Sequence, residues 1–488
     1  MSGNITAAGN SAPKLDVKYY IHSAIAILLM LIVPHLPVVE PLTPFGMQVA
    51  GIFLGCIYGW TMVSVVWPSL LGLLLLGFTE FGKMSATFQA AYGGDTYLFV
   101  FFMLAFAALI TTSGVTDYMA KWVISRKIAK GRPWVIAFLV YLAAYIVGAL
   151  VSVMPSIVIC WTLTYQLCRA FGYTNKDLYP KLMVIGVVNA ALMGHCVFPF
   201  KPFAVMMLQV LNTQLGISID FAVFTFFAFV LGFGSVILYL LICKYIYKPD
   251  VAPIQNSTYV YENTDKLTLY QKEVLGLLFA LVILLLLPGF LPEGALKSFL
   301  GSLGNTGIVV GLLMLCGLIK LKNGESFADA AELIKKGVPW PTMILLATAM
   351  ALSSAIGNEA TGIKALFQTV FSPILTGHGM VAFFFLLILG GIILTNIINN
   401  VVVGMILVPI ICAASTALGF PAPILVVAVC LFCNITFLLP SGSPIAAFLH
   451  GNSEWVSSIE VQKYSILFIA VAIVWFTLVC VTLGNILW

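Results

Sequence analysis

Four short polar or proline-containing segments interrupt long apolar stretches of this sequence, and their residue types suit the binding of a small anion. The segments are Ser152-Val153-Met154-Pro155-Ser156, Phe198-Pro199-Phe200-Lys201-Pro202, Thr395-Asn396-Ile397-Ile398-Asn399-Asn400 and Leu439-Pro440-Ser441-Gly442-Ser443-Pro444. Hydroxyl and amide groups donate hydrogen bonds to carboxylate or sulfate oxygens. A helix that begins after such an interruption also presents free backbone amides and the positive end of its dipole, and both favour an anion.

The candidate substrate-binding residues are the polar side chains of these segments and the one charged residue among them. They are Ser152, Ser156, Lys201, Asn396, Asn399, Asn400, Ser441 and Ser443. Lys201 is expected to neutralise the anion, because a lysine at mid-membrane depth costs at least about 2.5–3.5 kcal/mol and needs a reason to be there. His195 is a second candidate for coupling, as a donor or proton carrier. None of the 18 acidic residues falls clearly at mid-depth, so a cationic substrate would lack a counter-charge.

Each of these residues could also have a purely structural role. Serine and asparagine in membrane helices commonly bond to a neighbouring helix, and a histidine such as His195 is more often a packing residue. The stem of Lys201 could reach water within a kinked helix while its charge takes no part in binding. For Asn399 and Asn400, the position beside a predicted helix break favours the binding role.

The composition predicts that the elements carrying these segments lie in a membrane. Of the 488 residues, 61% are hydrophobic and 8% are charged, whereas a soluble domain has about 25% charged residues. Apolar stretches near the roughly 20 residues that cross a bilayer recur along the chain, which predicts an all-α polytopic membrane protein. We expect 11 transmembrane helices, at about 20–39, 43–63, 64–80, 97–117, 180–212, 219–247, 271–290, 300–319, 340–358, 423–450 and 461–487.

Two further apolar segments, 134–170 and 376–417, are predicted to be re-entrant hairpins, because each carries one of the polar interruptions at its middle. Irregular backbone at membrane depth is tolerated only where it is buried in protein or lines a watery cavity. A proline-broken helix follows each hairpin, at 180–212 and 423–450. The hairpin tips and helix breaks therefore predict a binding site near the middle of the membrane.

The two halves of the chain are predicted to form an inverted repeat. A hydrophilic cytosolic linker at 248–270 separates the first transmembrane half, 20–247, from the second, 271–488. An odd number of crossings lies between the two copies, so they run through the membrane in opposite directions. Inverted repeats with broken helices at corresponding positions are typical of secondary transporters.

The basic residues place the tail 1–19 in the cytosol of a multi-pass protein of the plasma membrane. Of the 23 lysines and arginines, 19 fall on segments expected on the cytosolic side, while Lys83, Lys297 and Lys364 fall outside and Lys201 within the membrane. The net charge of +5 is modest and comes from these cytosolic clusters, which argues against nucleic acid as a partner. The first hairpin should open to the cytosol and the second to the outside.

The second hairpin and the break after it resemble the divalent-anion/sodium symporter family of the ion-transporter superfamily. The resemblance rests on Ile398-Asn399-Asn400-Val401-Val402-Val403-Gly404, Leu407-Val408-Pro409-Ile410 and Phe437-Leu438-Leu439-Pro440-Ser441-Gly442-Ser443-Pro444. It implies an elevator-type carrier, usually a homodimer, that moves dicarboxylates, tricarboxylates or sulfate with sodium or in exchange. It also implies weak sodium sites near Pro155, Asn399 and Gly442.

The sequence departs from this family at both hairpin tips. Asn399-Asn400-Val401 and Met154-Pro155-Ser156 stand where the family has Ser-Asn-Thr, and Ile445-Ala446 replace the end of its Thr-Pro-Pro-Asn turn. The sodium-binding segments are therefore altered, while Lys201 supplies a fixed positive charge nearby. These departures predict transport that does not depend on sodium, with either anion exchange or proton-linked uptake.

The sequence therefore predicts a secondary active transporter of a small anion, a di- or tricarboxylate above all, that works as a symporter or antiporter by elevator-type alternating access. An anion channel is an alternative, as is an arsenite-type, inorganic-anion or sodium/proton antiporter relative of the same superfamily. The sequence contains no H-E-x-x-H, G-x-S-x-G or phosphate-loop motif, so we expect neither an enzyme nor a cofactor. The expected partners are the anion, the bilayer and a second copy of the chain.

Overall fold

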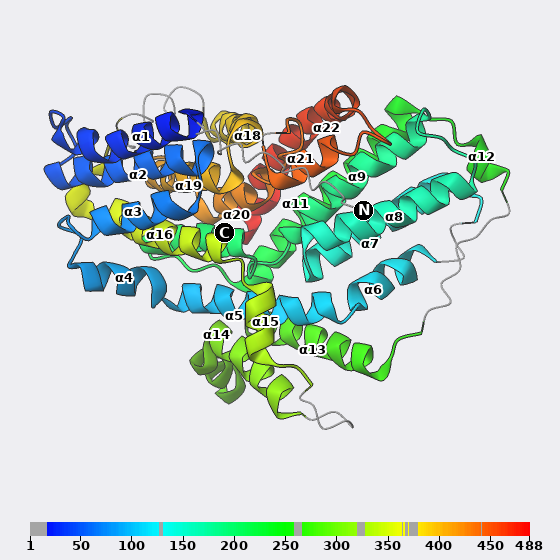
Figure 1. Ribbon diagram of the computed structural model, residues 1–488, viewed down its shortest axis with the longest axis horizontal. Coiled ribbons are helices and arrows are strands. Elements are labelled where there is room, and N and C mark those ends of the chain that lie inside the picture. The colour runs from blue at the N-terminus through cyan, green and yellow to red at the C-terminus, as the bar shows by residue number, and fades with distance from the viewer. Residues whose placement is uncertain are drawn as a thin grey trace, which may run out of the picture.

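The computed structural model describes residues 17–125, 130–257, 266–319, 327–363, 365–366, 369, 379–440 and 442–488. Every regular element in these ranges is a helix (Figure 1), which confirms the predicted all-α class. Twelve helices in the described part of the chain are long and apolar enough to cross a bilayer. Residues 1–16 of the predicted tail, 258–265 of the linker and the first residues, 376–378, of the second predicted hairpin lie outside the described ranges.

The first half of the chain contains the helices up to the linker. They are α1 (Val17–Ile32), α2 (Pro44–Met62), α3 (Val66–Leu76), α4 (Met84–Tyr92), α5 (Asp95–Thr112), α6 (Val115–Ile124), α7 (Pro133–Leu150), α8 (Val153–Ala170), α9 (Leu178–His195), α10 (Pro202–Leu215), α11 (Phe221–Ile242) and the short α12 (Ala252–Gln255). The second half contains α13 (Leu269–Leu286), α14 (Ala295–Leu318), α15 (Ala330–Gly337), α16 (Trp340–Gly357), α18 (Gly379–Ile397), α19 (Asn400–Leu418), α20 (Ala422–Phe432), α21 (Pro444–His450), α22 (Ser458–Val479) and α23 (Asn485–Leu487).

One expected crossing, at 64–80, is instead the short helix α3 followed by a turn. α3 has 11 residues and ends before Gly77, so it rises about 17 Å, roughly half the thickness of the hydrocarbon core. The chain then re-forms helix at α4 and reaches the 18-residue α5. The apolar run at 64–80 is nearly long enough to cross, but its helix does not continue to the end of that run, and the prediction of a full span there was wrong.

Two pairs of consecutive helices form hairpins, in which a connection of two residues joins the first helix to the second. Val151 and Ser152 join α7 to α8, and Ile398 and Asn399 join α18 to α19; the helices of each pair pack against one another. α7 and α8 lie side by side (Figure 1). The second turn falls inside the polar segment at which the sequence suggested a hairpin tip, and the first turn lies at the start of its segment, with Val151 one residue before it.

Two other apolar stretches are interrupted helices. α9 ends at His195 and α10 resumes at Pro202, while α20 ends at Phe432 and α21 resumes at Pro444. In both cases proline is the first residue of the second helix. The backbone amide at this position has no partner within the helix, so the missing N–H of proline costs no hydrogen bond. The proline therefore fixes where each helix restarts without leaving an unpaired donor in the protein interior.

Reciprocal glycines press α7 against α9 and thereby bring the first hairpin tip next to the first helix break. A Cβ atom at Gly148 of α7 would collide with the Ala191 carbonyl of α9, and one at Gly194 of α9 would collide with the Tyr145 carbonyl of α7. Small residues allow such close backbone approach between membrane helices. Because Gly148 lies just before the tip and Gly194 just before the break, this contact sets their relative position.

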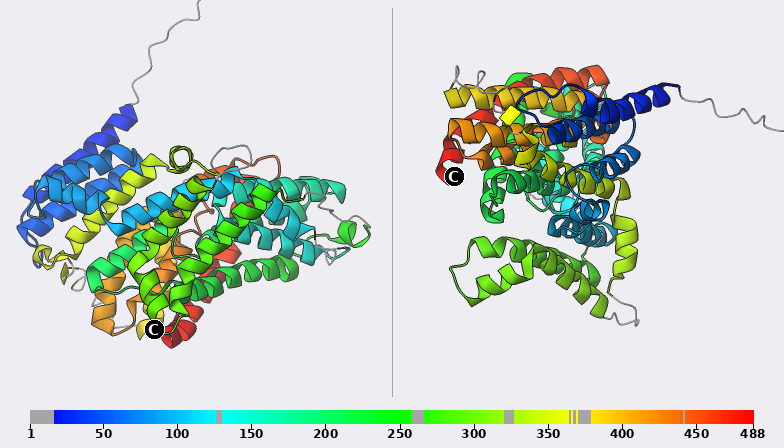
Figure 2. Two further views of the ribbon diagram at one scale, coloured as in Figure 1. Left: turned by 90° about the horizontal axis from the view of Figure 1, so that it is seen from below. Right: turned by 90° about the vertical axis from the view of Figure 1, so that its left-hand side faces the viewer.

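Helices α13 and α14 lie at one edge of the bundle (Figure 2), and many of their apolar side chains are exposed. α14 packs directly against α5, and α15 packs against both α14 and α5. α16 then runs back beside α3, α4 and α10. One wall of the bundle is thus built from α5, α15 and α16, outside the hairpins and broken helices.

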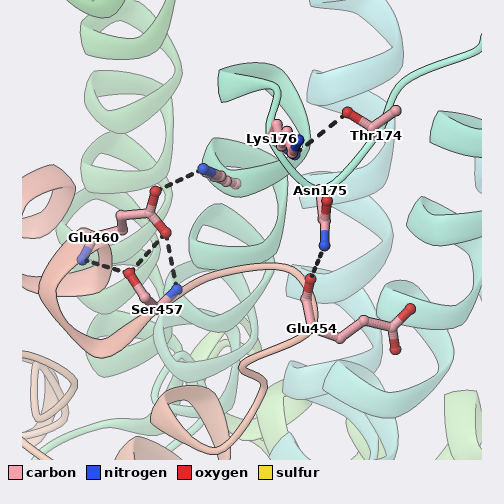
Figure 3. A network of polar contacts seen from close by, with 7 residues as sticks. Thr174, Asn175, Lys176, Glu454, Ser457 and Glu460 are labelled. Carbon is pink, nitrogen blue, oxygen red and sulfur yellow. Dashed lines mark hydrogen bonds and ion pairs between the residues drawn. The ribbon is translucent and has the colours of Figure 1, made fainter.

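Polar contacts join the two halves of the chain between the loop after α8 and the segment before α22 (Figure 3). Asn175 donates from Nδ2 to the Glu454 carbonyl at 3.0 Å, and Lys181 Nζ lies 2.6 Å from Glu460 Oε1. The Ser457 hydroxyl and Glu460 form a capping box that begins α22. The ring of Tyr165 in α8 stacks on Trp455 at a centroid distance of 4.8 Å. These contacts therefore connect the first hairpin and α9 to the segment between α21 and α22 and to the start of α22.

The glycine contact leads to a stability prediction. Gly194→Ala should destabilise the protein by about 1–3 kcal/mol, because the added methyl group forces the α7 backbone away. Thermal unfolding of the detergent-solubilised protein measures this as a lower melting temperature. Gly276→Ala in α13 is the matched control, since a Cβ there meets nothing within 4 Å. Equal melting temperatures for the two variants would contradict the close contact.

Candidate functional site

A cavity of about 530 Å³ lies where the hairpin tips and the helix breaks meet. Val151, Ser152 and Pro155 contribute from the first tip, and Asn400 and Val401 from the second. His195 and the segment 200–203 contribute from the first helix break, and Asn434 from the second. The opposite part of the lining comes from α5 and from the α15–α16 segment, including Thr112, Lys336 and Thr342. The two halves of the chain thus share one cavity.

Lys201 is buried in this cavity and its ammonium group is held by the first hairpin tip. Its side chain is 6% exposed, and Nζ donates to the Val151 carbonyl at 3.0 Å. Nζ also lies 5.9 Å from the centroid of the Phe200 ring, at a distance typical of a cation–π contact. Lys201 immediately precedes Pro202, the first residue of α10, so its charge lies at the amino end of a helix.

No acidic side chain belongs to the described lining of the cavity, whose two charged side chains are Lys201 and Lys336. Lys201 has no carboxylate partner among the ion pairs of the described residues. The Val151 carbonyl orients the ammonium group but carries no net charge to neutralise it. With Lys201 protonated, the cavity is electropositive, and an anion entering it would meet a cation that lacks a counter-ion among the described residues.

Asn400 and Asn434 connect the second tip to the second break on the cavity wall. Asn400 Nδ2 donates to Asn434 Oδ1 at 3.1 Å, and Asn434 Nδ2 donates to the Cys430 carbonyl at 2.8 Å. Asn434 was not among the residues predicted from the sequence, because the proline-rich segment five residues later marked the break too late. The polar Asn434 and Thr436, within an otherwise apolar run, are the signal that could have found it.

Asn396 is fully engaged in holding the second break and does not line the cavity. Its Nδ2 donates to the carbonyls of Ile392 and Ile435 at 2.8 and 2.7 Å, and its Oδ1 accepts from the Leu438 amide at 2.8 Å. The side chain is 3% exposed. Two of these bonds, to the Ile435 carbonyl and from the Leu438 amide, satisfy backbone groups that the interruption of α20 leaves free, so Asn396 holds the second break in place.

Other predicted site residues also satisfy backbone groups away from the described cavity lining. The buried Ser156 hydroxyl donates to the Ala144 carbonyl at 2.7 Å and ties α8 to α7. Asn399 caps α19 by accepting from the Val401 amide at 2.9 Å, and Ser443 caps α21 by accepting from the Ala446 amide at 3.0 Å. Gly442 packs against the backbone of the second break. Ser441 lies outside the described residues.

The predicted residues that the structure does bring together on the cavity wall are Ser152, Pro155, His195, Lys201 and Asn400. Ser152 precedes the first residue of α8, and its hydroxyl makes no capping bond there, so it can turn toward a ligand. His195 is the last residue of α9, and its Nδ1 is buried without a hydrogen-bond partner among the described residues. The side chains of Ser152, His195 and Asn400 can donate hydrogen bonds beside the ammonium group of Lys201.

Comparison with known proteins identifies relatives that are transporters. The chain is 26% identical over 336 residues to an uncharacterized transporter of Methanocaldococcus jannaschii, an alignment that covers 67% of this chain and 68% of the relative. Among solved structures, the YdaH transporter of Alcanivorax borkumensis aligns with a TM-score of 0.60 and 13% identity over 96% of this chain and 97% of that one.

A second solved structure with the same fold is Neisseria gonorrhoeae MtrF, described as illuminating a class of antimetabolite efflux pumps. It aligns with a TM-score of 0.61 and 13% identity over 97% of this chain and 96% of MtrF. At this level of identity both alignments show a shared fold.

The model of a citrate transporter family matches residues 21–431, which include both hairpins and the first helix break. This family lies in the ion-transporter superfamily expected from the sequence, while the narrower assignment to the divalent-anion/sodium symporters stays a prediction. The match covers most of the chain and all but one of the cavity-lining segments. The protein is therefore a membrane transporter that belongs to the citrate transporter family.

Proposed function

We propose that this protein is a secondary active carrier for a small anion of the di- or tricarboxylate class. The observation that carries the proposal is the buried ammonium group of Lys201, which lies in a cavity without an acidic lining residue among those described. A buried charge needs a partner of opposite sign. A substrate carboxylate would supply that partner each time the cavity is loaded.

The helix ends around the cavity support binding of an anion rather than of a neutral solute. α8 begins after Ser152, α10 after Lys201 and α19 after Asn399, so the amino ends of three helices adjoin the cavity-lining segments. Free amides and the helix dipole favour negative charge at such ends. Ser152, Asn400 and Asn434 add neutral donors that can bind the remaining carboxylate oxygens.

We further propose that transport does not require sodium, because Lys201 takes the electrostatic role of a bound cation. Its Nζ already bonds to a carbonyl oxygen of the first hairpin tip, and main-chain oxygens of this kind are what a sodium ion would otherwise bind. A permanently attached ammonium provides the positive charge in every transport cycle. Coupling would then come from exchange of anions or from a proton, for which His195 is the candidate carrier.

The proposed transport motion is an elevator-type displacement of the connected hairpins and broken helices against the wall formed by α5, α15 and α16. It is supported by the stacking of Trp161 in α8 on Phe448 in α21 at a centroid distance of 5.0 Å and by the neighbouring polar contacts of Figure 3, which join the segment after α8 to the segment before α22. In this proposal both hairpins are re-entrant, the halves form an inverted repeat, and the chain works as a homodimer. The amino terminus lies in the cytosol and the protein in the plasma membrane.

The role of Lys201 can be tested by transport in proteoliposomes. Lys201→Met should lower citrate or succinate uptake by about ten- to hundredfold, because loss of a charge-assisted bond costs about 1.5–3 kcal/mol. Wild-type uptake should persist when choline replaces sodium. Lys297→Met is the control, since Lys297 is paired with Glu293 at 2.6 Å on the surface. Normal uptake by Lys201→Met together with a steep sodium requirement in the wild type would refute the surrogate-cation role.

Alanine variants of Asn400 and Asn396 should differ in whether anion affinity or thermal stability is affected more. Asn400→Ala is expected to weaken anion binding by about 1–3 kcal/mol and to lower the melting temperature less than Asn396→Ala does, because its side chain lines the cavity. Asn396→Ala should lower the melting temperature more, because it leaves the Ile435 carbonyl and the Leu438 amide without their side-chain partner. Isothermal titration and thermal unfolding measure the two effects. If Asn400→Ala binds anions as the wild type does, Asn400 serves only to pack the tip.

A further inference from the structure

Lys336, the second charged side chain of the cavity, comes from α15 rather than from a hairpin or a broken helix. It was not among the predicted site residues, because α15 has the pattern of a short amphipathic surface helix with the basic residues Lys335 and Lys336 in its last turn. Cations in the last turn of a helix are favourable for the helix dipole. The helix dipole stabilises both lysines equally, so it does not explain why Lys336 rather than Lys335 lines the cavity.

The backbone at Lys336 is pressed onto α5, so its place beside the cavity is fixed. A Cβ atom at Gly337 would lie 2.5 Å from Ala108 Cβ and 2.7 Å from the Leu104 carbonyl. Leu333 and Val338 on either side are buried. Only glycine allows this approach of α15 to α5. Because Leu104 and Ala108 themselves line the cavity, the residue next to Gly337 is held at the cavity wall.

The charge of Lys336 is only partly compensated. Glu332 is its one ion-pair partner among the described residues, at 3.8 Å, and Glu332 is also 3.7 Å from Lys335. One carboxylate between two ammonium groups leaves a net positive charge. All three side chains are at least half exposed, so the pairing is weak and can be given up to a ligand.

We propose that Lys336 is a substrate-recognition residue of the wall formed by α5, α15 and α16, which binds a further negative charge of a multiply charged anion whose first carboxylate meets Lys201. This inference rests on the proposed carrier function and goes beyond it. Lys201 precedes α10 and Lys336 ends α15, and both line the same cavity, so in this proposal an anion with several carboxylates contacts both. An anion with fewer charges engages Lys201 and leaves Lys336 with Glu332.

The test compares Lys336→Gln with Lys335→Gln, which removes the same charge from the same helix turn beside the cavity. Both lysines share Glu332, but only Lys336 lines the cavity. We expect Lys336→Gln to weaken citrate binding about fivefold, as for a partly exposed ion pair, and to weaken succinate binding less. Lys335→Gln should bind both anions as the wild type does. Isothermal titration of the purified, full-length variants at low and high salt measures this, and added salt should weaken citrate binding less in Lys336→Gln than in the wild type.

The outcomes separate the two proposals. If the wild type binds citrate or succinate and the two glutamine variants behave alike, Lys336 is not a recognition residue, and the carrier proposal stands. If both variants lose uptake equally, and only in liposomes that contain anionic lipid, α15 anchors to lipid and the inference is wrong. If the wild type binds no anion and Lys201→Met changes nothing, the carrier proposal fails and this inference fails with it.

Discussion

The site depends on how the protein satisfies the backbone groups that become free where its helices are interrupted inside an apolar bundle. An unpaired amide or carbonyl in such a place costs several kcal/mol. Asn396 bonds to two of these groups, the Ile435 carbonyl and the Leu438 amide, Ser156 ties the arms of the first hairpin, and the Thr395 hydroxyl donates to the Cys433 carbonyl at 2.6 Å. These bonds hold the interruptions in place, and the polar groups that remain can serve a ligand.

This division of tasks is the reason that only some of the polar residues reach the cavity. Side chains that bond back to the main chain, such as Asn396 and Ser443, keep the tips and breaks in place. Lys201, Asn400 and Asn434 lie on the wall that these residues build. These three also bond to the main chain: Lys201 donates to the Val151 carbonyl, Asn400 accepts from the Val401 amide and Asn434 donates to the Cys430 carbonyl. Lys201 alone among them can carry a charge, and no described carboxylate neutralises it. In the proposed function, Lys201 Nζ therefore binds both the substrate anion and the Val151 carbonyl of the first hairpin tip.

The positions of the helix interruptions could be predicted from sequence, because proline and polar residues seldom occur together in the middle of an apolar run unless the helix is broken there. The turn at Ile398–Asn399 lies within the segment so chosen, and the turn at Val151–Ser152 lies at the edge of its segment. Which polar side chain faces a ligand could not be predicted, since Asn396 and Asn400 have the same chemistry and differ only in the direction they point. Lys336 could not be predicted for another reason: α15 meets the cavity through the close contact of Gly337 with α5, which leaves no mark in the local pattern. The prediction of a span at 64–80 was wrong because the hydropathy of a segment does not indicate where its helix ends.

Substrate binding, as proposed, depends above all on the positive charge of the buried Lys201 ammonium. A cryo-electron microscopy structure of the full-length protein with citrate, prepared in choline buffer without sodium, tests this dependence most directly. We expect a citrate carboxylate within hydrogen-bonding distance of Lys201 Nζ, between the two hairpin tips. Citrate bound elsewhere in the protein, or density for the anion only after sodium is added, would contradict the proposed role of Lys201.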